Sequence, residues 1–234
     1  MPDKIHLNLV PDELRLPTEI LAIIINELAL DTGDNDRTLA ALTSCRLASH
    51  VFCSLTTPLF FSSIELTDDV RLFTSRKDRL KASNLLWTRA TKLSQILTTD
   101  DVAASVQNFT LRCHPENLTS QTNGTLISTI LHRLPRIQIF SLEALETNSE
   151  RGFLLFSLMT DGFSSAIQVM CRSPSLTTLS LDNIKGFPAT AIAACPNLQC
   201  LHLWCVEPSV SFKFSVSFFR DNSFCTPVRQ RKFD

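Results

Sequence analysis

Three segments of the amino-acid sequence share one template, in which a proline is followed by apolar residues at fixed spacing and by a final leucine. The segments are Pro135 to Leu142, Pro174 to Leu181 and Pro196 to Leu203, and each reads Pro-x-aliphatic-x-x-apolar-x-Leu. A recurring template of this kind indicates structural units that bury too little surface alone and gain a core by stacking on their neighbours. The repeat therefore constrains the architecture more than any single motif does.

A weaker fourth copy precedes these three segments. Val106, Phe109 and Leu111 fill its apolar positions, and Ala104 stands at the position of the proline. The L-x-x-L-x-L spacing resembles the strand of leucine-rich repeats, which implies a solenoid with a parallel sheet. We expect the weak copy to be the first and atypical unit of an α/β array.

The units are unevenly spaced along the chain. The intervals between equivalent positions are 31, 39 and 22 residues, and only the last is usual for a leucine-rich repeat. The positions compared are Val106, Ile137, Leu176 and Leu198. Regular repeats place Asn or Cys three residues after the final leucine, but this sequence has His114, Leu145, Ile184 and Val206 there. We therefore expect insertions in the earlier units and an irregular array.

The composition favours a soluble globular protein. The chain has 234 residues, of which 44% are hydrophobic, and a formal net charge of −1, so it can bury the core of one or two domains. No basic face recurs along the sequence, so nucleic acid is not an expected partner. The longest wholly apolar run, Ile20 to Ile25, is too short for a signal peptide or a membrane span. We expect a protein of the cytoplasm or nucleus without a membrane partner.

Residues that could bind a cofactor or catalyse a reaction are not grouped at motif spacing. The eight cysteines include no Cys-x-x-Cys pair, which favours free thiols in a reducing compartment over a zinc site. The five glycines stand too far apart to form a phosphate-binding loop. The five histidines have no recurring carboxylate, serine or cysteine partner. We therefore expect no cofactor, no metal ion and no catalytic residue.

The N-terminal quarter predicts a helix that is apolar on nearly every side. Pro17 can begin a helix without losing a needed N–H, and the helix is predicted over Thr18 to Leu28. Such a helix must be covered all round, yet a segment of roughly fifty residues has little interior to cover it. Either the repeats cover the remaining apolar face or that face binds a partner, and the composition of the helix favours neither alternative.

A second helical stretch is predicted over Thr38 to Phe52 from apolar residues at three- or four-residue spacing. The acidic segment Asp31 to Asp36 has no Glu that could close a calcium-binding loop, so we expect it to start this helix, with Asp36 near the N-cap. Thr57-Pro58 is predicted to end the helical pattern. Leu59 to Leu66 then alternates at its end, as a short strand or an extended segment leading into the next domain.

The residues of this N-terminal region resemble an F-box. The matching positions are Leu16-Pro17-x-Glu19-Ile20-Leu21-x-x-Ile24, Leu39-x-x-Leu42-x-x-Cys45-Arg46-x-x-Ser49 and Pro58-Leu59-Phe60-Phe61-Ser62-Ser63-Ile64. Together with the repeats, they resemble the fungal F-box-like proteins with degenerate leucine-rich repeats. The resemblance implies a small helical F-box-like bundle followed by an irregular leucine-rich-repeat solenoid, which is an α+β arrangement for the chain as a whole.

The same resemblance implies a function. F-box proteins are non-catalytic substrate-recognition subunits of SCF-type ubiquitin ligases: the F-box binds the SKP adaptor, and through it a cullin, while the repeats bind the protein to be degraded. By this resemblance the adaptor-facing residues are Leu16, Pro17, Ile20, Leu21 and Ile24. The alternative is a leucine-rich-repeat interaction scaffold with no ligase role.

The predicted domain boundaries follow from these assignments. They are an N-terminal tail at 1–10, an F-box-like domain at 11–66, a helical connector at 67–101, degenerate repeats at 102–206 and a Phe-rich tail at 207–234. The connector is locally basic, and we favour a solvated helical face there over a site for an acidic partner. Within the repeats, helices are predicted over Thr125 to Leu134 and Ser164 to Arg172.

Two alternatives stay open for the Phe-rich tail. Val210 to Phe218 alternates as a strand does, with phenylalanine at every second position over part of its length. Either this segment covers the last repeat, or the chain is a truncated version of a longer repeat protein.

The alternation of strand residues predicts where a target protein would bind. If the final leucines of the repeats point inward, as expected for Leu179, Leu181, Leu201 and Leu203, the residues between them project onto the outer face of the sheet. The candidate target-binding residues on that face are Arg112, Glu143, Asp182, His202 and Trp204. Trp204 and Arg112 have the side chains that dominate binding energy at interfaces. Packing of Trp204 beneath the Phe-rich tail is an equal alternative.

Overall fold

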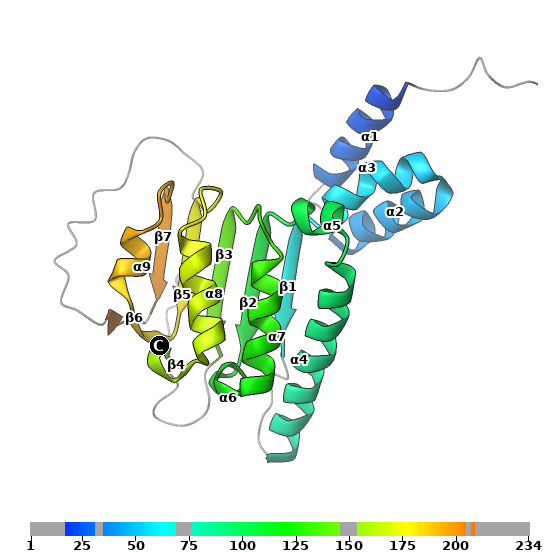
Figure 1. Cartoon of the computed structure of the whole chain (residues 1–234). Helices are drawn as coiled ribbons and strands as arrows, with labels where there is room; N and C mark the ends of the chain where they lie inside the picture. Colours follow the sequence, from blue (N-terminus) through cyan, green and yellow to red (C-terminus); the bar gives the residue numbers. More distant parts are fainter. Residues whose placement is uncertain (1–16, 31–34, 69–75, 146–153, 205–206, 209–234) are drawn as a thin grey trace, which may run out of the picture.

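The computed structural model describes residues 17–30, 35–68, 76–145, 154–204 and 207–208. The chain is a mixed α/β protein, in which a parallel sheet carries helices against one face and a further group of helices stands at one end of the sheet (Figure 1). The α/β class predicted from the sequence is confirmed. Leu16, the predicted N-terminal tail and the Phe-rich segment from residue 209 onward lie outside the described residues.

The main sheet follows the order of the chain, and each strand pairs in parallel with the next. Its strands are β1 (Ser63–Thr67), β2 (Asn108–Cys113), β3 (Ile139–Ala144), β5 (Thr178–Asp182) and β7 (Cys200–Trp204). The final leucines of the four template copies share one row across it: Leu111, Leu142, Leu181 and Leu203. All four copies are therefore neighbouring strands whose apolar residues face the same side.

Burial of the predicted inward leucines decreases at the last strand. Leu179 and Leu181 are fully buried, whereas Leu201 is half-buried and Leu203 is 41% exposed. The difference arises because β7 is the final strand of the main sheet in the described residues, so only β5 packs beside it. The inward direction predicted for all four leucines agrees with the register, but deep burial is limited to β5.

β1 corrects the predicted boundary between the first two domains. The predicted end of the first domain, residue 66, lies inside β1, which pairs with β2 along its whole length. Ile64 lies opposite Phe109 and Leu66 opposite Leu111, so β1 carries the same alternation as the four template copies. Of the two alternatives for the segment ending at Leu66, a short strand is the correct one.

The predicted connector is also part of the main fold. Helix α4 (Arg76–Ile96) packs against the sheet. Its residues Leu86, Ala90 and Leu93, and Leu97 directly after the helix, lie in the same hydrophobic core as the strands. These residues recur at three- or four-residue spacing and form one face of a helix, while Trp87 and Arg89 on other faces are exposed. The described part of the connector therefore has an exposed face at Trp87 and Arg89, while its opposite face packs against the sheet.

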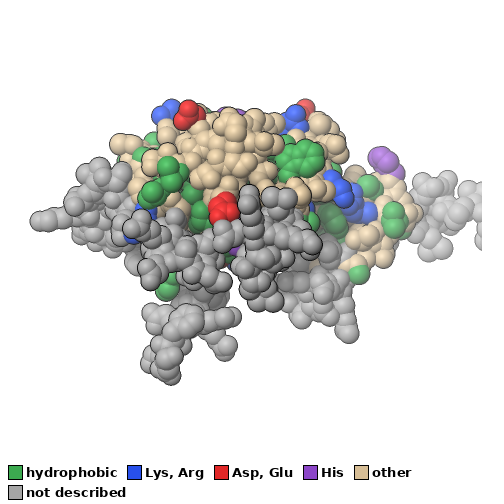
Figure 2. All heavy atoms as spheres, turned by 90° about the horizontal axis from the view of Figure 1, so that it is seen from below, with side chains coloured by type: hydrophobic (Ala, Val, Ile, Leu, Met, Phe, Trp, Pro, Cys, Tyr) green, Lys and Arg blue, Asp and Glu red, His purple; other side chains and the backbone are tan. Residues whose placement is uncertain are grey.

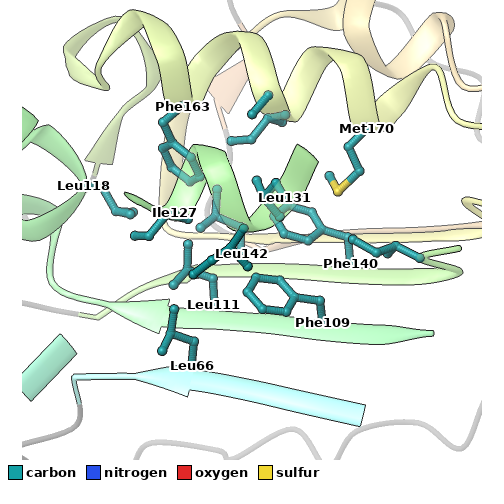
Figure 3. Close-up of a cluster of buried hydrophobic side chains, with 14 of the residues drawn as sticks. Leu66, Phe109, Leu111, Leu118, Ile127, Leu131, Phe140, Leu142, Phe163 and Met170 are labelled. Carbon is teal, nitrogen blue, oxygen red and sulfur yellow. The ribbon is translucent and has the colours of Figure 1, made fainter. Parts of the chain in front are cut away.

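The other helices alternate with the strands and cover the same face of the sheet (Figure 1). They are α5 (Asp100–Ser105), α6 (Pro115–Thr119), α7 (Gln121–His132), α8 (Asp161–Cys171) and α9 (Ala189–Ala193). The predicted helices at 125–134 and 164–172 correspond to α7 and α8, which begin three or four residues earlier than expected. Side chains from these helices and from the strands meet in one core (Figure 3), where the rings of Phe109 and Phe140 stack 6.3 Å apart.

A small second sheet was not predicted. It consists of β4 (Leu154–Leu155), β6 (Ile184–Phe187) and β8 (Glu207–Pro208), and a 3-10 turn at Phe156–Leu158 follows β4. The chain turns from β5 into β6 at Asn183, which has a left-handed backbone (φ 56°) and donates a hydrogen bond from Nδ2 to the carbonyl of Ala144 at 3.1 Å. Asparagine tolerates this backbone region better than other side chains do.

The helices at the end of the sheet are α1 (Thr18–Leu30), α2 (Asn35–Ala48) and α3 (His50–Phe60). The single helix predicted over Thr38 to Phe52 is wrong, because the extended Ser49 separates α2 from α3 and its hydroxyl accepts the N–H of Phe52 at 3.2 Å. Pro58 does not end the helical pattern, since α3 continues to Phe60. It lies in the last turn, where its missing N–H removes only one helical hydrogen bond.

Candidate protein-interaction surfaces

Helix α1 exposes an apolar face. Ile20, Ile23 and Ile24 are 42%, 57% and 51% exposed, whereas Ile25 is 2% exposed. Within the described residues, the sheet and its helices do not cover this face, which argues against the first alternative left by the sequence. Of the predicted adaptor-facing residues, Pro17, Ile20 and Ile24 are exposed and Leu21 is half-buried. Ile23 was missed, although its three-residue spacing from Ile20 indicates the same side of a helix.

The predicted target-binding residues converge on the face of the main sheet opposite the core. Parallel register places Arg112, Glu143, Asp182 and Trp204 in one row, one residue from each of four neighbouring strands. His202 lies in the adjacent row, opposite Ser180. The structure thus brings together five residues that lie between positions 112 and 204 of the sequence, and we name this surface the polar face.

Arg112 is held by carboxylates within the polar face. Its Nε donates to Oε2 of Glu143 at 2.6 Å, and its Nη1 donates to Oε1 of Glu65 at 3.3 Å. The three side chains are 29–52% exposed, so solvent screens these ion pairs and they contribute little stability. Glu65 was missed because β1 was not assigned to the repeats. Arg112 is already paired with Glu143 and Glu65. It can therefore contact a target protein, as expected from the sequence, only if the target displaces these carboxylates or shares the guanidinium with them.

Trp204 ends its row on β7 and is 64% exposed. The alternative in which Trp204 packs beneath the Phe-rich tail involves residues outside the described ones, so it stays open. Ile139 on β3 is 38% exposed and faces the same side, two residues before Ser141. The polar face therefore combines Arg112 and three carboxylates (Glu65, Glu143 and Asp182) with two exposed apolar side chains.

Cys200 and His202 form a close pair on the same face. Cys200 Sγ lies 3.0 Å from His202 Nε2, and the two residues are two positions apart in β7, so their side chains project to the same side. Cys200 is half-buried and His202 is exposed. His202 was predicted on this face as a target-binding residue, but its contact with the thiol of Cys200 was not predicted.

A buried polar cluster lies where β1 and β2 end. Asp68 has no exposed surface, and its carboxylate accepts hydrogen bonds from the backbone N–H of His114 at 3.0 Å and from Asn117 Nδ2. His114 Nδ1 lies 3.1 Å from the other carboxylate oxygen. Burial raises the pKa of the neighbouring Cys113 thiol well above its usual value, and the Asp68 carboxylate raises it further. Cys113 therefore stays protonated, and the cluster fixes the turn into α6 without supplying a nucleophile.

Within the described ranges, no three His, Cys, Asp or Glu side chains are grouped in a way that could hold a metal ion. No helix in those ranges has the length and apolar character needed to cross a membrane. Seen from the end at which the strands finish (Figure 2), the hydrophobic side chains of the described part lie in small patches separated by polar atoms.

Comparisons with known proteins place no further constraint on these surfaces. No protein-family model, no curated protein and no solved structure matches this chain.

Proposed function

We propose that the chain is the substrate-recognition subunit of an SCF-type ubiquitin ligase. In this proposal α1 to α3 are an F-box-like bundle that binds the SKP adaptor, and through it a cullin. The main sheet and its helices are an irregular leucine-rich-repeat solenoid whose polar face binds a target protein. The protein itself is a non-catalytic adaptor of the cytoplasm or nucleus.

The uncovered face of α1 is the observation that carries this proposal. Ile20, Ile23 and Ile24 lie on a helix at the end of the molecule and are each at least 42% exposed. Isoleucine is among the residues most often buried, and three of them exposed on adjacent turns favour a protein-binding surface. The F-box resemblance places the adaptor on the same residues, apart from Ile23.

The arrangement of the sheet supports the second half of the proposal. Strands in chain order, all parallel and joined through helices on one face, are the arrangement in which stacked repeats bury a shared core. The opposite face then presents one residue per strand in each row, which is an extended surface for a protein partner. Exposed Trp204 is a side chain of the kind that contributes most at such interfaces.

The adaptor interaction is tested by changing the α1 face in the full chain. Ile20→Asp combined with Ile24→Asp should weaken binding to purified SKP adaptor by roughly 10²- to 10⁴-fold, since each buried isoleucine contributes about 1.5–3 kcal/mol. Binding is measured by calorimetry, and circular dichroism confirms that the variant is folded. Val169→Asp is the matched control, because Val169 is 51% exposed on α8, away from the helical group.

Two results would contradict the adaptor proposal. One is unchanged affinity of the double variant for the adaptor. The other is absence of adaptor binding by the unaltered chain, which would favour the alternative of a repeat scaffold with no ligase role. That alternative rests on the same polar face and requires no partner for α1.

A further inference from the structure

The contact between Cys200 and His202 is a chemical feature that adaptor and target binding do not use. A thiol needs to lose its proton to become a nucleophile, and an imidazole at hydrogen-bond distance can accept that proton. Cys200 Sγ and His202 Nε2 are 3.0 Å apart, and both side chains stand on the polar face at the last strand of the main sheet. The pair therefore has the proximity and the access that thiolate chemistry requires.

The residues opposite the pair on β5 are uncharged. Thr178 lies opposite Cys200 on β5, and Ser180 lies opposite His202. Asp182 is the next residue of β5 on the polar face, and it lies opposite Trp204. The residues directly opposite the pair therefore place no carboxylate against the thiol that would oppose its ionisation.

Three of the other described thiols are less readily ionised. Burial raises the pKa of the Cys113, Cys171 and Cys195 thiols above their usual value. Cys45 and Cys53 are half-buried, and Cys53 Sγ lies 3.9 Å from the hydroxyl of Thr57, which is not a base. Within the described residues, Cys200 is the thiol with an imidazole at hydrogen-bond distance.

We propose that Cys200 is a thiol-modification site that forms a mixed disulfide with low-molecular-weight disulfides. His202 accepts the thiol proton, and the Cys200 thiolate attacks one sulfur of the small disulfide. A new bond forms between Cys200 Sγ and that sulfur, the original S–S bond breaks, and the second half leaves as a thiolate that takes up a proton. Cys200 is oxidised and the departing half is reduced, so no further oxidant is needed. The proposal is independent of the SCF assignment.

The test is site-resolved reaction of the folded full chain with oxidised glutathione at pH 7. Peptide mass spectrometry follows the mixed disulfide at each cysteine over time. Cys200 should react at least several-fold faster than Cys45 and Cys53. His202→Gln should slow reaction at Cys200 by about ten-fold, because the variant lacks the imidazole that accepts the thiol proton.

His132→Gln is the matched control, since His132 is an exposed imidazole in the last turn of α7 and should leave the Cys200 rate unchanged. As a second measurement, the pH at which alkylation of Cys200 by iodoacetamide reaches half its maximal rate should be lower in the unaltered chain than in His202→Gln. A Cys200 rate no greater than that of Cys45 and Cys53, an unchanged rate in His202→Gln, or equal alkylation midpoints in the two chains would each overturn the proposal.

Discussion

Asp68 shows how a single buried residue organises a chain turn. A carboxylate without exposed surface is costly unless several donors surround it, and Asp68 has donors on the backbone of His114 and on the side chain of Asn117. Its own N–H donates to the carbonyl of Arg112 at 3.3 Å. The residue therefore connects the end of β1 to the turn between β2 and α6.

Replacing Asp68 by alanine should lower the free energy of unfolding by roughly 1–3 kcal/mol, because donors that are now paired would be left buried without an acceptor. Urea denaturation followed by circular dichroism measures the change. Asp101→Ala is the control, since Asp101 is exposed in the first turn of α5 and should change stability by about 0.5 kcal/mol or less. Equal stability of the two variants would show that the cluster does not stabilise the fold.

At the scale of elements, α7 and α8 approach each other closely at Gly124. A Cβ added there would lie 2.8 Å from Thr160 Cγ2 and also against Thr160 Oγ1. Thr160 is 8% exposed, and its hydroxyl accepts the N–H of Phe163, so it cannot move without uncapping α8. Nearby, Ser128 Oγ donates to the carbonyl of Gly162 at 2.9 Å and holds the same two helices together.

Gly124→Ala should therefore destabilise the protein by about 1–2 kcal/mol, although alanine is the better helix former, because the clash with Thr160 costs more than the gain in helix propensity. Gly162→Ala supplies the contrast: the atom nearest to its added Cβ is Ser128 Oγ at 3.8 Å, an ordinary contact. That variant should be neutral or up to about 1 kcal/mol more stable. Thermal unfolding of both variants checks the difference, and an opposite order would refute the close approach of the helices.

At the scale of the whole molecule, one hydrophobic core joins β1 to β5 and includes α4, α7 and α8. Leu66, Leu111, Leu142 and Leu181 occupy a single row of the sheet, and each of them is at most 3% exposed. Each strand packs between two neighbours except at the ends of the sheet. The contribution of a leucine to the free energy of unfolding therefore depends on its place in the row.

Leu181→Ala should cost roughly 2–5 kcal/mol, as expected for a fully buried leucine. Leu203 occupies the same row on β7 but is 41% exposed, so Leu203→Ala should cost clearly less, about 1 kcal/mol. Guanidinium denaturation of the two variants measures both values under one condition. Equal costs would mean that β7 is packed as deeply as β5 and that the described arrangement of the last strand is incorrect.

Four strands of the main sheet and the direction of their side chains could be predicted from the sequence. The alternation in Phe109-x-Leu111 and Leu179-x-Leu181 indicates a strand with one buried and one solvated face. This pattern lies within each strand, so it can be identified without knowing which segments pack together. Ile64-x-Leu66 has the same alternation, but its neighbours resemble an F-box, so the segment was assigned to the preceding domain. Convergence of Arg112, Glu143 and Trp204 followed directly from the repeat register.

Tertiary structure alone decided which apolar residues are covered. Ile20, Ile23, Ile24 and Ile25 are chemically identical and nearly adjacent, yet only Ile25 is buried, because α2 and α3 pack against one side of α1. Asp68 and His114 are 46 residues apart, and nothing local in either segment predicts their contact. Local patterns determine the faces of an element, whereas burial and pairing depend on which distant segments meet those faces, and that depends on the packing of the whole chain.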